Sequence, residues 1–130
     1  MSSILPDLVT SHNISLQVYF GEYDFLLNHF SAELTLHNMA WNGAQGFSSP
    51  ITQSFYSDNA APRSTKQDSE TSSNSGTPTE EEAGKRASER GVTYHLFRGA
   101  GHSVFLSKPR EMFAYVRNVV FAKSPLPDTT

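Results

Sequence analysis

A long stretch without large apolar side chains divides this sequence into two blocks. From Ser57 to Gly91 the chain contains no Val, Ile, Leu, Met, Phe, Tyr or Trp, and it is rich in Ser, Thr and Glu. A segment of this composition buries too little apolar surface to offset the entropy that it would lose on ordering. The sequence therefore predicts a low-complexity, disordered insertion over residues 57–91, tolerated within a surface loop. A regulatory or phosphorylated loop is the alternative.

Size and charge restrict what the two blocks can do. The chain has 130 residues and a net charge of −3, which suits one modest domain and gives no reason to expect nucleic acid or a membrane as a partner. No apolar run is long enough to span a bilayer, and the N-terminus lacks the basic start and apolar core of a signal peptide. The sequence has no cysteine, so disulfides, thiolate nucleophiles and cysteine-based zinc sites are not available.

The first block, residues 1–56, is typical of a helix, a strand and a second helix. A short helix is expected at residues 4–9, and apolar and polar side chains then alternate over residues 14–20 with the period of a β-strand. Asn28 follows the end of this strand and is expected to cap a helix. A further short strand is expected at residues 51–56. The helix is expected to direct three large side chains toward one face, namely Phe30, Leu34 and Trp41.

The second block, residues 92–123, is typical of a strand followed by a closing helix. Apolar residues alternate from Val92 to Leu96 in what is expected to be an edge strand, and Ser107 is expected to cap a helix with Pro109 in its first turn. Residues 124–130 are expected to form a loose tail. The closing helix carries an apolar stripe that consists of Met112, Phe113, Val116, Val119 and Val120.

The order of these elements predicts an α/β fold with two main parallel strands and flanking helices, interrupted by the insertion. Parallel strands are stable when both faces of the sheet are covered, and two strands alone leave open edges. The chain therefore resembles one end of a larger sheet. Expressed alone, it is expected to be aggregation-prone or partly unfolded, because half of a parallel sheet exposes apolar faces.

Two titratable residues follow the two predicted strands. Asp24 comes shortly after the first strand, and His102 comes after the Gly-Ala-Gly turn that ends the second. Loops at the carboxyl ends of parallel strands converge, so a carboxylate there can hold an imidazole as in the orienting half of a nucleophile–His–Asp triad. A turn-forming Asp and a structural His remain the alternative. The remaining histidines show no metal-ligand spacing, so no metal site is expected; they are His12, His29, His37 and His95.

Three motifs in order resemble the C-terminal segment of the serine carboxypeptidases, an α/β-hydrolase family. The first motif is matched by Gly21, Asp24, Phe25 and Asn28, and the second by Trp41, Gly43 and Phe47. The third is matched by Thr93, Ala100, Gly101, His102, Val104 and Pro109. The resemblance covers nearly all of the residues outside the insertion. It implies that residues 1–56 carry the triad acid, Asp24, and that residues 92–123 carry the triad base, His102.

The resemblance also implies features that this chain lacks or changes. The family needs a serine on a Gly-x-Ser-x-Gly elbow, and no such pentapeptide occurs here. Leu27 replaces a cysteine that many members carry beside the substrate pocket, and Ser103 replaces a methionine, so both are candidate pocket residues. The implied activity is hydrolysis of C-terminal peptide bonds without a cofactor, with peptide or protein C-termini as substrates and an upstream half as a possible partner.

Three further expectations follow. By resemblance the protein is secreted or vacuolar, and Asn13 lies in a glycosylation sequon. The alternatives to a carboxypeptidase segment are a non-catalytic truncated remnant or binding piece, and a segment of another α/β-hydrolase such as an esterase or acyltransferase.

Overall fold

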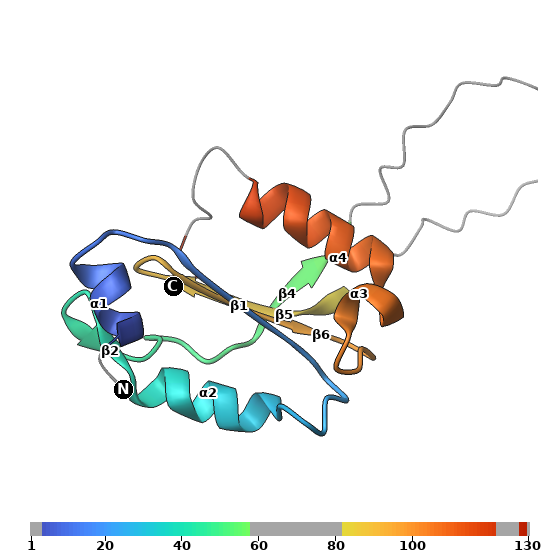
Figure 1. Ribbon diagram of the computed structural model, residues 1–130, viewed down its shortest axis with the longest axis horizontal. Helices are drawn as coiled ribbons and strands as arrows, with labels where there is room; N and C mark the ends of the chain where they lie inside the picture. The colour runs from blue at the N-terminus through green and yellow to red at the C-terminus, as the bar shows by residue number, and fades with distance from the viewer. Residues whose placement is uncertain (1–3, 58–81, 122–127, 130) are drawn as a thin grey trace, which may run out of the picture.

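A four-stranded mixed sheet with helices on both faces forms the centre of the molecule (Figure 1). The computed structural model describes residues 4–57, 82–121 and 128–129. The strands lie in the order β1-β6-β5-β4, and β2 and β3 form a separate two-stranded hairpin. In chain order the elements are α1 (Ile4–Thr10), β1 (Leu16–Gly21), α2 (His29–Asn38), β2 (Ala40–Trp41), β3 (Ala44–Gln45), β4 (Gln53–Tyr56), β5 (Glu82–Glu89), β6 (Val92–Phe97), α3 (Val104–Ser107), α4 (Pro109–Tyr115) and the π-helical segment η1 (Val116–Val120).

The predicted pair of parallel strands is confirmed. β1 runs parallel to β6, in a register that places Leu16 opposite Val92 and Gly21 opposite Phe97. The carboxyl ends of both strands therefore lie at the same end of the sheet. β5 pairs antiparallel with β6 and with β4, so the sheet is mixed. No helix among the described residues is long and apolar enough to cross a bilayer.

The boundary of the predicted insertion is wrong at its C-terminal end. Residues 82–89 form β5, an inner strand that is hydrogen-bonded on both sides. This strand does not need large apolar side chains of its own to be buried. Gly84 leaves the space into which the Phe55 ring packs, since a Cβ on Gly84 would lie 2.8 Å from that ring. Neighbouring strands supply the aromatic rings, and the strand itself supplies backbone pairing. The rest of the predicted insertion, residues 58–81, lies outside the described residues.

Each face of the sheet has its own apolar cluster. The face covered by α1 and α2, here called the α2 face, buries Val9, Leu36, Trp41, Val92 and Tyr94. The opposite face, here called the α4 face, buries Phe97, Ala100, Val104 and Tyr115. Two buried layers on one sheet give the arrangement that an α/β fold requires.

The predicted cap of helix α2 is confirmed, but its predicted apolar face is wrong. Asn28 does cap α2, and it accepts a hydrogen bond from the Phe30 backbone N–H at 2.8 Å. However, Phe30 and Leu34 are 68% and 62% exposed, and Trp41 is buried in β2 instead of lying on the helix. The helix packs through Leu36 because its buried side is one-third of a turn away from the side that the spacing suggested.

The C-terminal elements also differ from expectation. Ser107 ends α3, and Lys108 occupies the N-cap of α4 without a side-chain bond, although Pro109 begins that helix as expected. Within the predicted apolar stripe, Phe113 is 65% and Val120 45% exposed. Tyr115 is buried instead, because its ring is surrounded by the aromatic side chains of β1 and β6. The other members of the stripe pack on the α4 face, namely Met112, Val116 and Val119.

The two described residues of the predicted loose tail make defined contacts. The Thr129 N–H donates to the Ser88 carbonyl at 2.8 Å, and the Ser88 N–H donates to Thr129 Oγ1 at 3.0 Å. Asp128 accepts a hydrogen bond from the Arg90 backbone N–H at 3.3 Å. Residues 128–129 therefore occupy the part of the β5 edge that β4 leaves unpaired.

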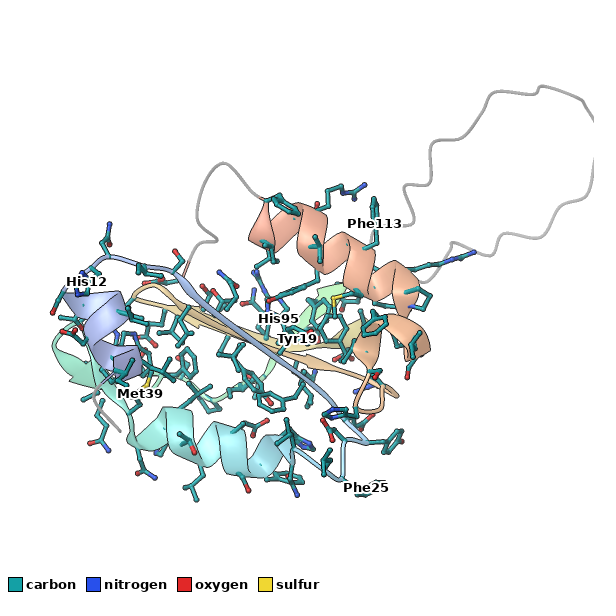
Figure 2. All side chains as sticks on the ribbon, in the orientation of Figure 1. His12, Tyr19, Phe25, Met39, His95 and Phe113 are labelled. Carbon is teal, nitrogen blue, oxygen red and sulfur yellow. The ribbon has the colours of Figure 1, made fainter. Side chains whose placement is uncertain are left out.

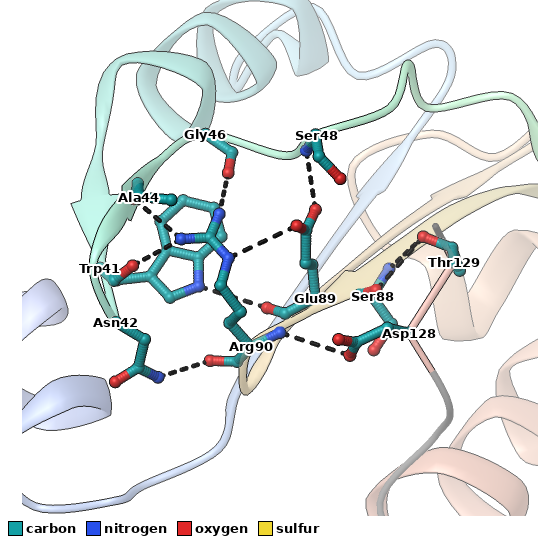
Figure 3. A network of polar contacts seen from close by, with 10 residues as sticks. All are labelled: Trp41, Asn42, Ala44, Gly46, Ser48, Ser88, Glu89, Arg90, Asp128 and Thr129. Carbon is teal, nitrogen blue, oxygen red and sulfur yellow. Dashed lines mark hydrogen bonds and ion pairs between the residues drawn. The ribbon is translucent and has the colours of Figure 1, made fainter.

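Arg90 fastens the β2–β3 hairpin to the β5–β6 turn (Figure 3). Its guanidinium donates to the carbonyls of Trp41 at 2.6 Å and Ala44 at 2.8 Å, and also to the Gly46 carbonyl. The same group lies 4.3 Å from the centre of the Trp41 ring. One side chain thus satisfies three backbone acceptors, although its own backbone has a left-handed φ of 53°.

We predict that Arg90→Ala lowers the free energy of unfolding by about 3 kcal/mol, because it leaves half-buried carbonyls without a charged donor. Arg90→Gly should lose about 1 kcal/mol less, since glycine adopts a positive φ without strain. Urea unfolding measures both, and Arg110→Ala, on the exposed side of α4, is the matched control. Equal loss for Arg90→Ala and Arg110→Ala would contradict this role.

His95 is a buried histidine in an inner strand, not in the edge strand that the sequence suggested. It is 1% exposed, and its ring packs 4.9 Å from Phe55 and 4.8 Å from Tyr115, on the α4 face beside Tyr19 (Figure 2). Burial, together with the nearby positive charge of Arg86, lowers its pKa from 6.5 to about 3. The imidazole is therefore neutral in the folded protein across the physiological range.

This buried histidine should make the fold less stable in mild acid. Between pH 6.5 and about pH 3 the unfolded chain binds a proton at this position and the folded chain does not. The free energy of unfolding should thus fall as the pH falls, with a contribution of up to about 1.4 kcal/mol per pH unit. His95→Asn should flatten this slope in urea titrations between pH 6.5 and 4.5, whereas the exposed control His12→Asn should keep it. An unchanged slope in His95→Asn would refute the assignment.

Candidate active site

The two loops that follow β1 and β6 lie side by side at the carboxyl end of these strands. The Glu22 N–H donates to the Phe97 carbonyl at 3.0 Å, and the Tyr23 N–H donates to the Ala100 carbonyl at 2.9 Å. The Glu22 carboxylate accepts a further bond from the Gly99 N–H at 2.8 Å. The loops that carry the two candidate residues are therefore joined directly, by two bonds between backbone groups and one to the Glu22 side chain.

Asp24 and His102 meet across these loops. His102 Nδ1 lies 2.9 Å from Asp24 Oδ2, although the two residues are far apart in sequence. The Asp24 side chain is 5% exposed, whereas that of His102 is 54% exposed. An ionised carboxylate only accepts hydrogen bonds, so Nδ1 carries the proton, and in the neutral ring Nε2 is an open acceptor. No described residue bonds Nε2, which leaves it available to a reacting group.

The second carboxylate oxygen of Asp24 is held by its own loop. Asp24 Oδ1 accepts hydrogen bonds from the backbone N–H groups of Leu26 and Leu27, each at 2.9 Å. The bond from Leu27, followed by the bond from His102, lowers the pKa of Asp24 below its usual value, and burial only partly opposes this. The carboxylate is therefore ionised and fixed in orientation at neutral pH.

Gly21 makes the close approach of the two loops possible. A Cβ at this position would lie 2.5 Å from the Ala100 carbonyl oxygen and closer still to that of Gly101. Any larger residue at the end of β1 would push the Asp24 loop away from the residues that precede His102. Sequence analysis identified Gly21 only as the end of a strand, and this requirement appears only when the parallel neighbour is known.

The other candidate residues lie near the pair to different degrees. Leu27 is 56% exposed and contacts Asp24 through its backbone N–H. Ser103 follows His102 and occupies the N-cap of α3 without a side-chain hydrogen bond to that helix. Asn13 is exposed in the turn between α1 and β1, with a φ of 52°. Glu22 was not predicted to be a site residue, and only its bond to Gly99 reveals its place between the loops.

Large apolar side chains are exposed around the Asp24 loop. Phe25 is 92% and Leu26 77% exposed, and Figure 2 shows Phe25 pointing away from the sheet. Helix α2 and residues 47–51 line a groove of about 620 Å³. Within the described ranges, no group of three or more His, Asp or Glu side chains is arranged to hold a metal ion.

The fold is that of an α/β-hydrolase. The structure superposes on Kex1(delta)p, a prohormone-processing carboxypeptidase from Saccharomyces cerevisiae, with a TM-score of 0.63 and 23% identity, covering 90% of this chain and 21% of that one. At this identity the likeness establishes the fold alone. In sequence, a family model for serine carboxypeptidases matches residues 1–122.

Individual relatives agree with this match. A carboxypeptidase Y homolog from Arthroderma benhamiae is 36% identical over 117 residues, which are 90% of this chain and 19% of the relative. The pheromone-processing carboxypeptidase kex1 of Schizosaccharomyces pombe is 28% identical over 111 residues, or 85% of this chain and 18% of that protein. The chain belongs to the serine carboxypeptidase family, and it spans about a fifth of the length of these relatives.

We predict that Gly21→Ala separates the two loops and breaks the Asp24–His102 hydrogen bond. The steric conflict involves backbone atoms, so a loss of about 3 kcal/mol or more in the free energy of unfolding is expected. Gly43→Ala is the matched control, because no heavy atom lies within 4 Å of its Cβ position and only its φ of 84° opposes the change. The control should cost about 1–2 kcal/mol. Urea unfolding that gave equal losses would contradict the prediction.

Proposed function

We propose that this chain contributes the general base and the orienting acid of a serine-type carboxypeptidase. The observation that supports this proposal most directly is the 2.9 Å contact between His102 Nδ1 and Asp24 Oδ2 at the ends of adjacent parallel strands. His102 is the base and Asp24 is the acid that holds it. Asp24 keeps the ring in the tautomer with the proton on Nδ1 and stabilises the imidazolium that forms during the reaction.

In this proposal the chemistry takes place at His102 Nε2. A serine hydroxyl attacks the carbonyl carbon of the last peptide bond of a substrate, and Nε2 accepts the hydroxyl proton. When the tetrahedral intermediate collapses, the C–N bond breaks and Nε2 returns the proton to the departing amine. Water then attacks the acyl-serine ester with His102 again as base. The exposed edge of the ring and the buried, ionised Asp24 are suited to these two tasks.

The nucleophile must come from outside the 130 residues. This sequence contains no Gly-x-Ser-x-Gly elbow, and Ser103 follows the histidine instead of lying at a strand-to-helix turn. The relatives continue well beyond the part that this chain matches. We therefore propose that an upstream half, carrying the serine, is the partner of this chain. The exposed apolar side chains around Asp24 are consistent with such a neighbour.

Substrate and location follow from the relatives as proposals. The two relatives described above are named as carboxypeptidases, and the one from Schizosaccharomyces pombe as pheromone-processing, so peptide or protein C-termini are the proposed substrates. Leu27, three residues after Asp24, and Ser103, directly after His102, are proposed to contact the substrate. A secreted or vacuolar location is proposed, with Asn13 as a glycosylation site that is exposed in a turn.

A non-catalytic role is the second candidate. The absence of the serine elbow from these 130 residues favours it. A binding piece would keep the fold and the apolar surface but would need no partner with a reactive serine. Co-purification from the source organism distinguishes the two: a partner with a serine elbow supports the split site, and stable isolation without one supports the binding piece.

The proposed function is tested in a chimera. In the carboxypeptidase Y homolog, the segment that matches this chain is replaced by residues 1–122, and cleavage of a blocked dipeptide is measured. Activity is expected, and both His102→Ala and Asp24→Asn should lower kcat by about 10⁴-fold. The exposed control His12→Ala should keep it. Activity that survives His102→Ala would refute the role of the base.

A second measurement addresses the pair directly. In the chain alone, ring ¹⁵N chemical shifts of His102 should report a proton on Nδ1, because Asp24 accepts it. Asp24→Asn presents an amide that can donate, so the tautomer with the proton on Nε2 should gain population. A serine-reactive fluorophosphonate should not label the chain alone. Stoichiometric labelling would mean that the nucleophile lies within these residues.

A further inference from the structure

A small pocket opens on the α4 face, away from the loops that carry Asp24 and His102. Its volume is about 150 Å³, below the range of drug-sized sites, so it suits a ligand of a few heavy atoms. Strands β4, β5 and β6 supply one side and the closing helix supplies the other. The lining residues are Phe55, Tyr56, Arg86, His95, Ala114, Tyr115, Asn118 and Val119.

Arg86 is the charged group of this pocket. It is half-buried in β5, and burial lowers the pKa of its guanidinium from the usual value. Within the described part of the chain, Arg86 makes no hydrogen bond or ion pair, whereas Arg90 and Arg98 each lie within 4 Å of a carboxylate. No acidic side chain is among the residues that line the pocket. A half-buried guanidinium without a protein acceptor can be stabilised by an anion that takes the place of water beside it.

His95 is a second polar group without a partner. The residue is 1% exposed and lines the pocket, and its Nδ1 atom is buried without a hydrogen bond. Buried polar atoms in proteins nearly always have a partner, so an open one marks a place where a ligand or water belongs. The imidazole is neutral, and the pocket therefore has a single positive charge.

The composition of the lining selects among anions. One guanidinium balances one negative charge, and its planar pair of N–H donors matches the two oxygens of a carboxylate. Inorganic phosphate is a mixture of the singly and doubly charged anions at neutral pH, and the doubly charged form would remain partly uncompensated in this half-buried site. The ring of Phe55 and the side chains of Ala114 and Val119 supply apolar contacts for a short hydrocarbon group.

We propose that this pocket binds a small monocarboxylate with a short apolar substituent, held by the Arg86 guanidinium beside His95, its partner on the neighbouring strand. The site uses no residue of the Asp24 or His102 loops. It is therefore independent of the proposed peptidase function, and either proposal can fail without the other.

The experiment compares ligands on the unmodified 130-residue chain. Butyrate is titrated while the ring signals of His95 and Tyr56 are followed by NMR, with ionic strength held constant by sodium chloride. Butyramide, which has the same shape without the charge, and inorganic phosphate are titrated in the same way. Saturable shifts of the His95 signals with butyrate alone are expected. No saturation with butyrate, or equal responses to butyramide, phosphate or chloride, would overturn the proposal.

Two variants test whether the charge of Arg86 is responsible for butyrate binding. Arg86→Met should weaken butyrate binding by about tenfold or more, because it removes a charge-assisted pair of hydrogen bonds. Arg110→Met, which removes an exposed arginine from α4, is the control and should bind as the parent chain does. If Arg86→Met does not fold, Arg86→Lys keeps the charge without the planar fork and should bind butyrate more weakly than the parent. Unchanged binding in the folded Arg86 variant would contradict the proposal.

Discussion

The parallel pairing of β1 with β6 determines where everything else in this structure lies. Residue 16 pairs with residue 92 and residue 21 with residue 97, so the two strands end side by side. The loops that follow them therefore lie together at the carboxyl end of the sheet. Backbone hydrogen bonds between the loops then fix their spacing, and Gly21 allows the contact to be close. The Asp24–His102 pair is a consequence of this register. A shift by one residue would place side chains on the opposite face and separate the loops.

The pair differs from an ordinary surface ion pair in the way its two members are placed. Asp24 is almost completely buried and is held by three hydrogen bonds, whereas His102 remains half-exposed. A fixed acceptor and an accessible ring form an asymmetric arrangement, in which one group sets the orientation and the other can meet a substrate. The apolar side chains that are exposed next to Asp24 form a hydrophobic surface beside the pair.

Much of this arrangement could be predicted from sequence, and the reasons are local. The alternation of apolar residues in β1 and β6, the cap at Asn28 and the polar residues after each strand are all encoded within a few positions. β5 could not be predicted, because its small and charged side chains lack a strand pattern and its stability comes from partners on both sides. The burial of His95 and the contacts of Arg90 depend on neighbours far away in the chain, so no local pattern reveals them.

The chain leaves the sheet at Tyr56 and returns at Glu82, and these two residues face each other across the β4–β5 ladder. The points of departure and return are therefore fixed by the sheet itself and not by what joins them. For a flexible connection, each doubling of its length adds only about 0.6 kcal/mol of closure entropy. This position can thus accept segments of very different size while the register of the strands is preserved. The connection leaves at the same end of the strands as the Asp24 and His102 loops, but on the opposite edge of the sheet from β1, so sequence can be added there while the β1–β6 register is kept.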